Sequence, residues 1–361
     1  MSRPAILFVC DAGPDVGGGH VMRSLTLAQA LTAAGATCAF LARPAVETVL
    51  DTFAPETART VATEPFDAVV FDHYGLSAPD HRALAKGRPT LVIDDLANRP
   101  LEADLVLDSG PSRQAQDYAG LTPPGAALLL GPNHAPVRLA FAALREAALD
   151  RRAAGGPVRR ILVSLGLTDV GGITGRVVDL LLPRLGDMAL DVVMGGGAPS
   201  LPRLQAMADP RLTLHVDTQD MPRLTLAADL AIGAGGSSSW ERCILALPTL
   251  TLVLADNQVA VAAALTEAGA SLRLDASSAD FDVAFGQQVD RLVADGALRA
   301  MLSAASALVC DGDGARRVAA AFLAHISRTR SATAPAAMTC EVIADTPGDA
   351  DHEPSHTGEP S

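Results

Sequence analysis

Aromatic residues, lysine and paired cysteines are all scarce in this sequence of 361 residues. Aromatic side chains make up 3% of it, so a core must be built from Ala, Leu and Val. Lys86 is the only lysine, which excludes a GK[ST] phosphate loop and argues against Schiff-base chemistry. The five cysteines form no CxxC pair, and we interpret them as small buried apolar residues, not as a zinc site or a disulfide framework.

Long apolar runs and basic stripes are also missing. The opening run Ala5–Cys10 stops at Asp11, as a first strand does and a signal peptide does not, so we expect a cytoplasmic protein without a membrane partner. Without a basic stripe, nucleic acid is not an expected partner. Residues 331–361 contain six acids and no Lys or Arg, which leaves −7 of the net charge of −13 for the rest. We predict that this acidic tail is disordered and dispensable.

Short apolar and β-branched runs alternate with Ala- and Leu-rich runs of helical spacing. This alternation is typical of a parallel sheet with helices on both faces, and it occurs in two series. The Gly/Pro/Arg-rich stretch DRRAAGGPVRR separates them, so we place a boundary near Gly155–Pro157, between an α/β domain of residues 1–154 and a second of residues 155–330.

The predicted strands are Ala5–Cys10, Thr37–Leu41, Ala68–Phe71, Thr90–Ile93, Leu105–Leu107, Leu128–Leu130, Arg160–Ser164, Leu190–Met194, Leu212–Val216, Leu230–Gly233 and Thr249–Leu254. The predicted helices are Val21–Ala33, Pro79–Lys86, Val137–Ala148, Ile173–Leu182, Met221–Ala228, Ser238–Leu247, Gln258–Ala268 and Ala297–Val309. Glycine loops follow strands in both series, and ligands bind at the carboxyl edge of such sheets. We therefore expect two carboxyl edges that face each other across a cleft.

The stretch GGGHVMR, residues 17–23, puts His20 directly after three glycines and before a long amphipathic run. Glycines let the backbone approach a ligand closely, and a helix start offers free N–H groups. A helix N-terminus disfavours positive charge, so His20 is expected to stay neutral and to suit a base better than a phosphate clamp. The alternative is a tight turn into a helix with an idle histidine.

The stretch AIGAGGSSSWERCILALP, residues 231–248, reads as a strand end, a loop of small residues and a helix start. In one interpretation the loop amides bind a diphosphate and Glu241 accepts hydrogen bonds from ribose hydroxyls. In the other, Ser238 and Glu241 form a capping box that closes the helix start. Both can hold at once. We interpret Trp240 as a packing residue.

Polar clusters directly follow apolar strands in FDHYGL, residues 71–76, and VIDDLANRPLEADLVLD, residues 92–108. Asp72, His73, Asp94 and Asp95 lie in these clusters. A metal site is one interpretation, but no ligand spacing is diagnostic, and turn-forming or helix-capping carboxylates are favoured instead. We expect neither a metal nor a cofactor.

Taken in order, these stretches resemble the UDP-2,4-diacetamido-2,4,6-trideoxy-β-L-altropyranose hydrolase family of pseudaminic acid biosynthesis. The resemblance implies a glycosyltransferase-B-like fold, with two Rossmann-like domains and the UDP-sugar between them. It implies hydrolysis at the anomeric carbon with inversion, giving UDP and the free sugar, and we expect a monomer. The motifs that carry it are GGGHVMRSLTLAQAL, DHYGL, VIDDLANRPLEADLVLD, LLLGPNHAPVR, ILVSLGLTD, AIGAGGSSSWERCILALP, LADNQ and DGDGARRVA.

The resemblance also assigns roles to residues. It puts the catalytic histidine at His20, where a neutral imidazole can take a proton from the attacking water. UDP is a good leaving group, so this scheme requires no metal. The implied substrate-binding residues for UDP and sugar are Gly18, Gly19, Arg23, Tyr74, Gly235, Gly236, Ser237, Glu241, Asn257 and Gln258.

The sequence departs from the family pattern at several positions. Leu167 and Val170 stand in a motif where the family has a second glycine and a later proline, and His134 stands where a tyrosine is expected, followed by Pro136 and Val137. These changes leave the exact sugar open, and the acidic tail has no expected counterpart. Two other functions also stay open: a glycosyltransferase of the same fold, and a nucleotide-sugar binding module without turnover.

Overall fold

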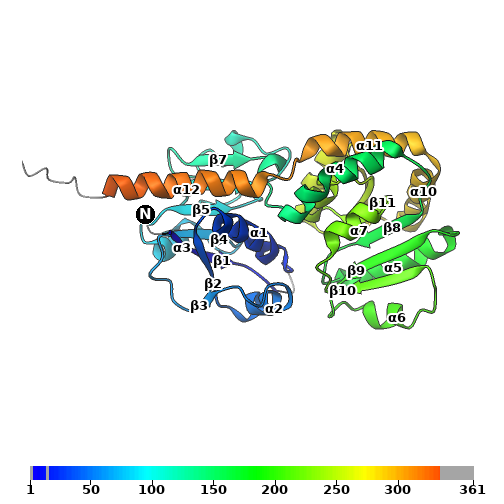
Figure 1. Cartoon of the computed structure of the whole chain (residues 1–361), viewed down its shortest axis with the longest axis horizontal. Coiled ribbons are helices and arrows are strands. Elements are labelled where there is room, and N and C mark those ends of the chain that lie inside the picture. The colour runs from blue at the N-terminus through cyan, green and yellow to red at the C-terminus, as the bar shows by residue number, and fades with distance from the viewer. Residues whose placement is uncertain (1–2, 14–15, 334–361) are drawn as a thin grey trace, which may run out of the picture.

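The computed structural model describes residues 3–13 and 16–333, which form two parallel sheets covered by helices (Figure 1). The first sheet has seven strands in the order β3-β2-β1-β4-β5-β6-β7, and the second has six in the order β10-β9-β8-β11-β12-β13. All of their strand pairs are parallel. The predicted α/β class with two parallel sheets is therefore confirmed.

The strands are β1 Ala5–Cys10, β2 Thr37–Leu41, β3 Arg59–Thr60, β4 Ala68–Asp72, β5 Thr90–Ile93, β6 Leu105–Asp108, β7 Ala127–Leu130, β8 Arg160–Ser164, β9 Ala189–Met194, β10 Leu212–Val216, β11 Leu230–Ala234, β12 Thr249–Val253 and β13 Leu272–Asp275. The α-helices are α1 Gly19–Ala33, α2 Pro44–Phe53, α3 Ala78–Ala85, α4 Leu139–Ala154, α5 Ile173–Leu181, α6 Leu201–Gln205, α7 Met221–Ala227, α8 Ser238–Ile244, α9 Val259–Glu267, α10 Phe281–Ala294, α11 Gly296–Val309 and α12 Gly314–Thr333. Short 3-10 turns include η2 Pro132–His134 and η5 Asp256–Gln258.

Several elements were not predicted from the sequence: β3, β13, α2, α6, α10 and α12. The strand β3 has two residues, and β13 alternates intermediate with exposed positions, so neither shows the apolar run that marked the other strands. The helix α12 runs to Thr333, three residues into the stretch that we assigned to the tail. The rest of the predicted tail, residues 334–361, lies outside the described residues.

The apolar run of β1 shows why the first sheet is covered on both faces. Ile6 and Phe8 pack on one side with helices α1, α2 and α12, whereas Leu7 and Val9 pack on the other with Phe71 and its neighbours. Successive side chains of a strand point to opposite faces, so a continuous apolar run requires a cover on each.

Two helices pack on the side of the molecule that the other series of elements forms: α4 lies beside α11, and α12 lies along the first sheet (Figure 1). In α4, Phe141 belongs to the cluster around Trp240 and Ile244, and the Arg145 guanidinium donates to the carbonyls of Ile244, Ala307 and Cys310 at 2.6–3.1 Å. In α12, Phe322 joins the core of the first sheet. We call the first sheet with α1–α3 and α12 the N-terminal body, and the second sheet with α4–α11 the C-terminal body.

The chain therefore passes between the bodies twice, before α4 and before α12, and not at the predicted boundary after α4. The two passages touch each other: Arg317 donates to the carbonyl of Asn133 at 2.8 Å, and the Cys310 thiol lies 3.3 Å from the carbonyl of Pro132. Gly314 has no room for a side chain, because a Cβ would clash with the carbonyl of Ala135. The departures at His134 and Pro136 fall in the first passage.

In each sheet, successive strands are added first towards one edge and then, from one point on, towards the other edge. In the first sheet the reversal lies between β1 and β4, and in the second between β8 and β11. Ligands bind at the carboxyl ends of strands beside such a reversal. Asp72 ends β4, and Gly233 lies near the end of β11, so both motif regions stand at these points.

Among the described residues, no single helix is both long and apolar enough to cross a membrane. The pair Phe281–Ala294 and Gly296–Ser331, bent by 93°, reaches that length and composition only when combined.

We predict that Phe322→Ala lowers the free energy of unfolding by about 3–5 kcal/mol, because the ring is fully buried in the N-terminal core. Leu308→Ala on α11 is the control, because Leu308 is 87% exposed. Urea unfolding followed by circular dichroism measures both variants. Equal, small effects would contradict the docking of α12 on the N-terminal body.

Candidate functional site

The carboxylate of Asp72 gathers three side chains of α1 at the end of β4. Its Oδ1 lies 2.5 Å from Nδ1 of His20 and accepts from Nη2 of Arg23 at 2.6 Å. Its Oδ2 accepts from Nε of Arg23 at 2.8 Å and from the hydroxyl of Ser24 at 3.1 Å. Asp72 is fully buried, so these contacts replace all of its hydration.

These contacts determine the tautomer of His20. An ionised carboxylate only accepts hydrogen bonds, so the 2.5 Å contact requires the proton on Nδ1 of His20. Nη2 of Arg23 lies 3.1 Å from the same nitrogen, but its hydrogen is directed to Asp72, because a protonated Nδ1 cannot accept. Nε2 of the neutral ring therefore keeps its lone pair and can accept a proton.

The charge on Asp72 is maintained by its partners. Burial alone would raise the pKa of this carboxyl, but Arg23 and His20 hold the pKa well below its usual range. A lowered pKa in the folded state means that the pair stabilises the fold above the ordinary carboxyl pKa, and that this stabilisation is lost as the pH falls. Asp72 is thus ionised at neutral pH.

Tyr74 connects this group to the C-terminal body. Its ring meets the His20 ring edge to face, with centroids 4.4 Å apart. Its hydroxyl faces Asp95, which raises its pKa, and Asn257, which acts against the shift and lies in η5 of the C-terminal body. Asp95 in turn accepts from Nη1 of Arg23 at 2.9 Å. Burial and Asp95 raise the pKa of Tyr74 far above its usual value, so the phenol keeps its proton.

The start of α1 also approaches the C-terminal body. Gly18 is the N-cap of α1 and has no capping side chain, and Gly19 is the first helical residue. A Cβ on Gly18 would lie 3.4 Å from Val49 and 4.0 Å from Cδ1 of Leu167. Leu167, one of the departures from the family pattern, therefore faces the glycine turn directly.

A buried arginine shapes the loop after β11. The guanidinium of Arg242 donates to the carbonyl of Ala234 at 2.7 Å and to the hydroxyls of Ser238 and Ser239 at 3.0 and 3.1 Å. It lies against Gly233, where a Cβ would be 2.5 Å from Nη1. Burial lowers the pKa of Arg242 to about 10. The sequence interpretation did not identify Arg242.

The amide of Gln258 connects this loop to the next strand. Its Oε1 accepts from the N–H of Gly235 at 3.3 Å and from that of Leu254 at 3.1 Å. Gly236 and Ser237 continue the loop to the start of α8. The structure thus brings Gly235, Asn257 and Gln258 together beside the carboxyl ends of β11 and β12.

The predicted capping box of α8 is wrong. The N-cap is Ser237, and no side chain bonds to the helix start there. Ser238 lies within the helix and bonds to Arg242, while Glu241 pairs with Arg138 at 3.1 Å. Burial raises the pKa of Glu241, although Arg138 acts against it. Arg242 lies four residues from Ser238 in the same helix, whereas Arg138 lies 103 residues from Glu241 and is brought to it by tertiary packing, which a local motif does not reveal.

The acidic residues after β5 and β6 serve structure, as the turn-and-cap interpretation expected. Asp94 accepts from the N–H of Ala97 at 2.8 Å, and Asp108 from that of Gly110 at 2.7 Å. The hydroxyl of Tyr118 lies 2.9 Å from Asp94 and 2.7 Å from Asp108. Asp72 and Asp95 are the exceptions, because their carboxylates bind the side chain of Arg23 in α1.

His73, the remaining candidate in these clusters, faces Asp11. Its Nδ1 accepts from the N–H of Gly75 at 3.0 Å and lies 3.4 Å from the carboxylate of Asp11. Burial lowers the pKa of His73. The ring is therefore neutral at pH 7.

No group of three or more His, Cys, Asp or Glu side chains within residues 3–13 and 16–333 is arranged to hold a metal ion. The letters HEPSH at residues 352–356 match the HExxH pattern, but they lie outside the described residues.

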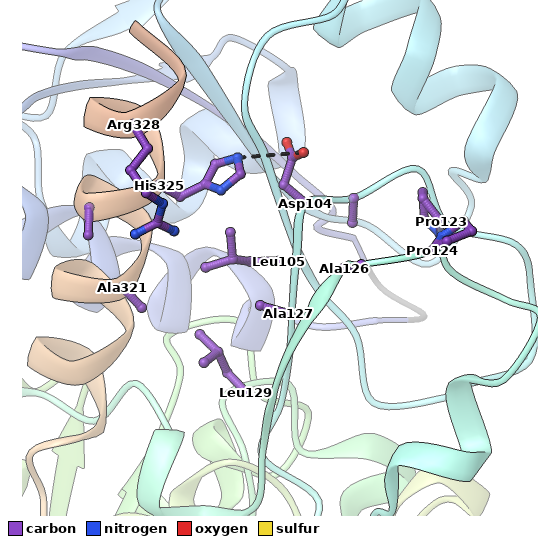
Figure 2. Close-up of a pocket in the computed structure, with 13 residues that line it drawn as sticks. Asp104, Leu105, Pro123, Pro124, Ala126, Ala127, Leu129, Ala321, His325 and Arg328 are labelled. Carbon is purple, nitrogen blue, oxygen red and sulfur yellow. Dashed lines mark ion pairs between the residues drawn. The ribbon is translucent and has the colours of Figure 1, made fainter. Parts of the chain in front are cut away.

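A cavity of about 390 Å³ lies between α12 and the amino ends of β6 and β7 (Figure 2). His325 of α12 faces Asp104 there at 3.5 Å, and Leu105 and Ala127 form the apolar wall. Asp104 precedes β6, whereas Asp72 stands at the carboxyl end of β4. The cavity is therefore on the opposite edge of the sheet from His20, and we assign it no part in the chemistry.

We predict that Gly233→Ala destabilises the protein by about 1–3 kcal/mol, because the new methyl group overlaps the buried Arg242 guanidinium. Gly236→Ala is the matched control, since nothing lies within 4 Å of a Cβ there. Denaturant unfolding compares the two variants. A Gly233→Ala protein as stable as Gly236→Ala would show that Arg242 does not occupy this position.

No protein-family model matches the chain. The spore coat polysaccharide biosynthesis protein SpsG of Bacillus subtilis is 29% identical over 194 residues, which is 53% of this chain and little more than half, 56%, of SpsG. The UDP-2,4-diacetamido-2,4,6-trideoxy-beta-L-altropyranose hydrolase of Campylobacter jejuni is 23% identical over 275 residues, covering 73% of this chain and 97% of the hydrolase.

Solved structures resemble the chain over most of its length. Acinetobacter baumannii MurG has a TM-score of 0.61 at 18% identity, covering 89% of this chain and all of MurG. The spinosyn rhamnosyltransferase SpnG has a TM-score of 0.63 at 16% identity, covering 90% of this chain and all of SpnG. A UDP complex of Staphylococcus aureus MnaA has a TM-score of 0.61 at 13% identity, covering 91% of this chain and 97% of MnaA. The chain therefore has the glycosyltransferase-B fold.

Proposed function

We propose that this protein hydrolyses a UDP-linked 2,4-diacetamido-2,4,6-trideoxy sugar of the altrose type at its anomeric carbon. The observation that carries the proposal is the buried His20–Asp72 pair, at the carboxyl edge that faces the C-terminal body. The likeness to the Campylobacter jejuni hydrolase, over 97% of that protein, supports the choice of sugar. The products are UDP and the free sugar, a precursor for pseudaminic acid synthesis.

The proposed step is a single displacement by water. Nε2 of His20 takes a proton from the water as its oxygen bonds to the anomeric carbon. The bond from that carbon to the UDP oxygen breaks, and UDP leaves with the electron pair. Attack from the face opposite UDP inverts the configuration. Asp72 stabilises the imidazolium that forms, because its carboxylate accepts a hydrogen bond from the protonated Nδ1 at 2.5 Å.

The C-terminal body holds UDP in this proposal. The loop Gly235–Ser237 contacts the diphosphate, with Asn257 and Gln258 beside it. Glu241 binds the ribose, for which it must share its carboxylate with Arg138. Tyr74 and the turn at Gly18 and Gly19 border the sugar. Arg23 is already paired with Asp72 and Asp95, so it contributes by holding these carboxylates in place.

A glycosyltransferase is the second candidate, and the structural likeness to the rhamnosyltransferase SpnG favours it. In a transferase an acceptor alcohol takes the place of water. The distinguishing experiment incubates the purified protein with the UDP-diacetamido-trideoxyaltrose and no acceptor, followed by NMR. Hydrolysis predicts release of UDP and free sugar in equal amounts, with the inverted anomer formed first. Slow release that an added alcohol accelerates would favour the transferase.

We predict that His20→Asn lowers the turnover rate about 10²–10⁴-fold, because the amide has no lone pair that accepts a proton at neutral pH. UDP affinity, which the other body provides, should change far less. Steady-state kinetics and calorimetric titration with UDP measure the two quantities.

His325→Asn is the control for this variant, since His325 lies on α12 at the opposite edge of the sheet. It should keep wild-type kinetics. Near-normal turnover in a folded His20→Asn protein would remove His20 from the mechanism.

A further inference from the structure

The guanidinium of Arg99 binds the backbone on both sides of Tyr74. Its Nη2 donates to the carbonyl of His73 at 3.2 Å, and its Nε donates to the carbonyl of Leu76 at 2.8 Å. Residues 73–76 follow β4, form a turn at 74–75 and belong to no helix or strand. Arg99 therefore supplies donors to carbonyls that no strand or helix satisfies.

The buried carboxylate of Asp94 holds the guanidinium of Arg99 in place. Its Nη1 donates to Oδ1 of this buried carboxylate at 2.7 Å. The other oxygen, Oδ2, lies 2.9 Å from the hydroxyl of Tyr118, which is 2.7 Å from Asp108. Tyr118 and Asp108 are also buried, so this chain of contacts is anchored in the core of the N-terminal body. The side chain of Arg99 has only a small exposed fraction, 14%.

Each of the two carboxylates that flank the phenol of Tyr118 has an arginine of its own. The hydroxyl of Tyr118 has a single proton and can donate to only one of the carboxylates at a time. Nε of Arg113 donates to Oδ2 of Asp108 at 2.6 Å, and Nη1 of Arg99 donates to Oδ1 of Asp94 at 2.7 Å. Burial raises the pKa of Asp108, while Tyr118 and Arg113 act against the shift. Arg99 is thus the cation that balances the charge of Asp94.

Tyr74, between the two bonded carbonyls, is the residue that contacts His20. The ring centroids lie 4.4 Å apart, and the phenol faces Asp95 and Asn257, which belongs to the C-terminal body. A shift of the 73–76 backbone would thus move the neighbour of the proposed base and the contact between the bodies at the same time.

We propose that Arg99 is a positioning residue that holds Tyr74 against His20 and within reach of Asn257. The inference rests on the proposed function for its kinetic consequence, though not for its geometry. An arginine is required, because three separate nitrogens of one guanidinium reach Asp94 and the carbonyls of His73 and Leu76, and a lysine has one nitrogen.

The test compares Arg99→Ala and Arg99→Lys with Arg82→Ala. Arg82 is an exposed arginine of the same body whose ion pair is with Glu102. The protein is labelled at histidine Cε1, and the His20 signal is assigned by its loss in His20→Asn. Both Arg99 variants should shift this NMR signal, because the Tyr74 ring moves, while Arg82→Ala leaves it in place.

Kinetics supply the second measurement. Misplacement of a neighbouring group by about 1 Å can cost about 10²-fold, and we expect kcat/KM of both Arg99 variants to fall by that order. UDP affinity should stay at the wild-type value. Arg99→Lys retains the charge opposite Asp94, so it keeps the comparison valid if Arg99→Ala does not fold.

An unshifted His20 signal in a folded Arg99 variant would overturn the inference, as would wild-type kcat/KM in Arg99→Lys. If the wild-type protein turns over no UDP-sugar, the proposed function fails. The His20 signal still decides whether Arg99 positions Tyr74.

Discussion

The contact between the carboxylate of Asp72 and the imidazole of His20 organises the whole carboxyl edge of the N-terminal body. Asp72 ends a central strand and is fully buried, so its position is fixed by the sheet. His20 stands in the first turn of α1, and the contact joins the helix start to the strand. Arg23 and Ser24, one turn further along α1, donate hydrogen bonds to the other oxygen of the same carboxylate. Strand, helix start and proton acceptor therefore form one unit.

The second constraint is that this unit must meet the other body. Tyr74 and Leu167 are the residues through which the two carboxyl edges approach each other, by the phenol contact to Asn257 and by the approach to Gly18. The crossed positions of α4 and α12 support this arrangement, since each helix packs on one body and is joined through a short passage to the other. A nucleotide on one body can thus present its sugar to a base on the other.

Local patterns predicted much of this structure. The apolar run of β1, the glycine turn before α1 and the loop after β11 each depend on residues close in sequence, so their elements and the place of His20 could be predicted. The partners could not. Asp72 lies 52 residues from His20, and Arg138 lies 103 residues from Glu241. The predicted capping box failed because Glu241 pairs with a residue distant in the sequence. The helix α12 docks on the N-terminal body, although its first residue, Gly314, lies some 300 residues after Ala5 of β1.

The tautomer of His20 tests the account most directly, because the proposed chemistry needs a free lone pair on Nε2. Nitrogen-15 NMR of the imidazoles at neutral pH, assigned with His20→Asn, measures it. We predict that His20 carries its proton on Nδ1, with a proton resonance far downfield from the short bond to Asp72. A neutral His20 protonated on Nε2 would contradict the account, since such a ring could not accept a proton from water at that position.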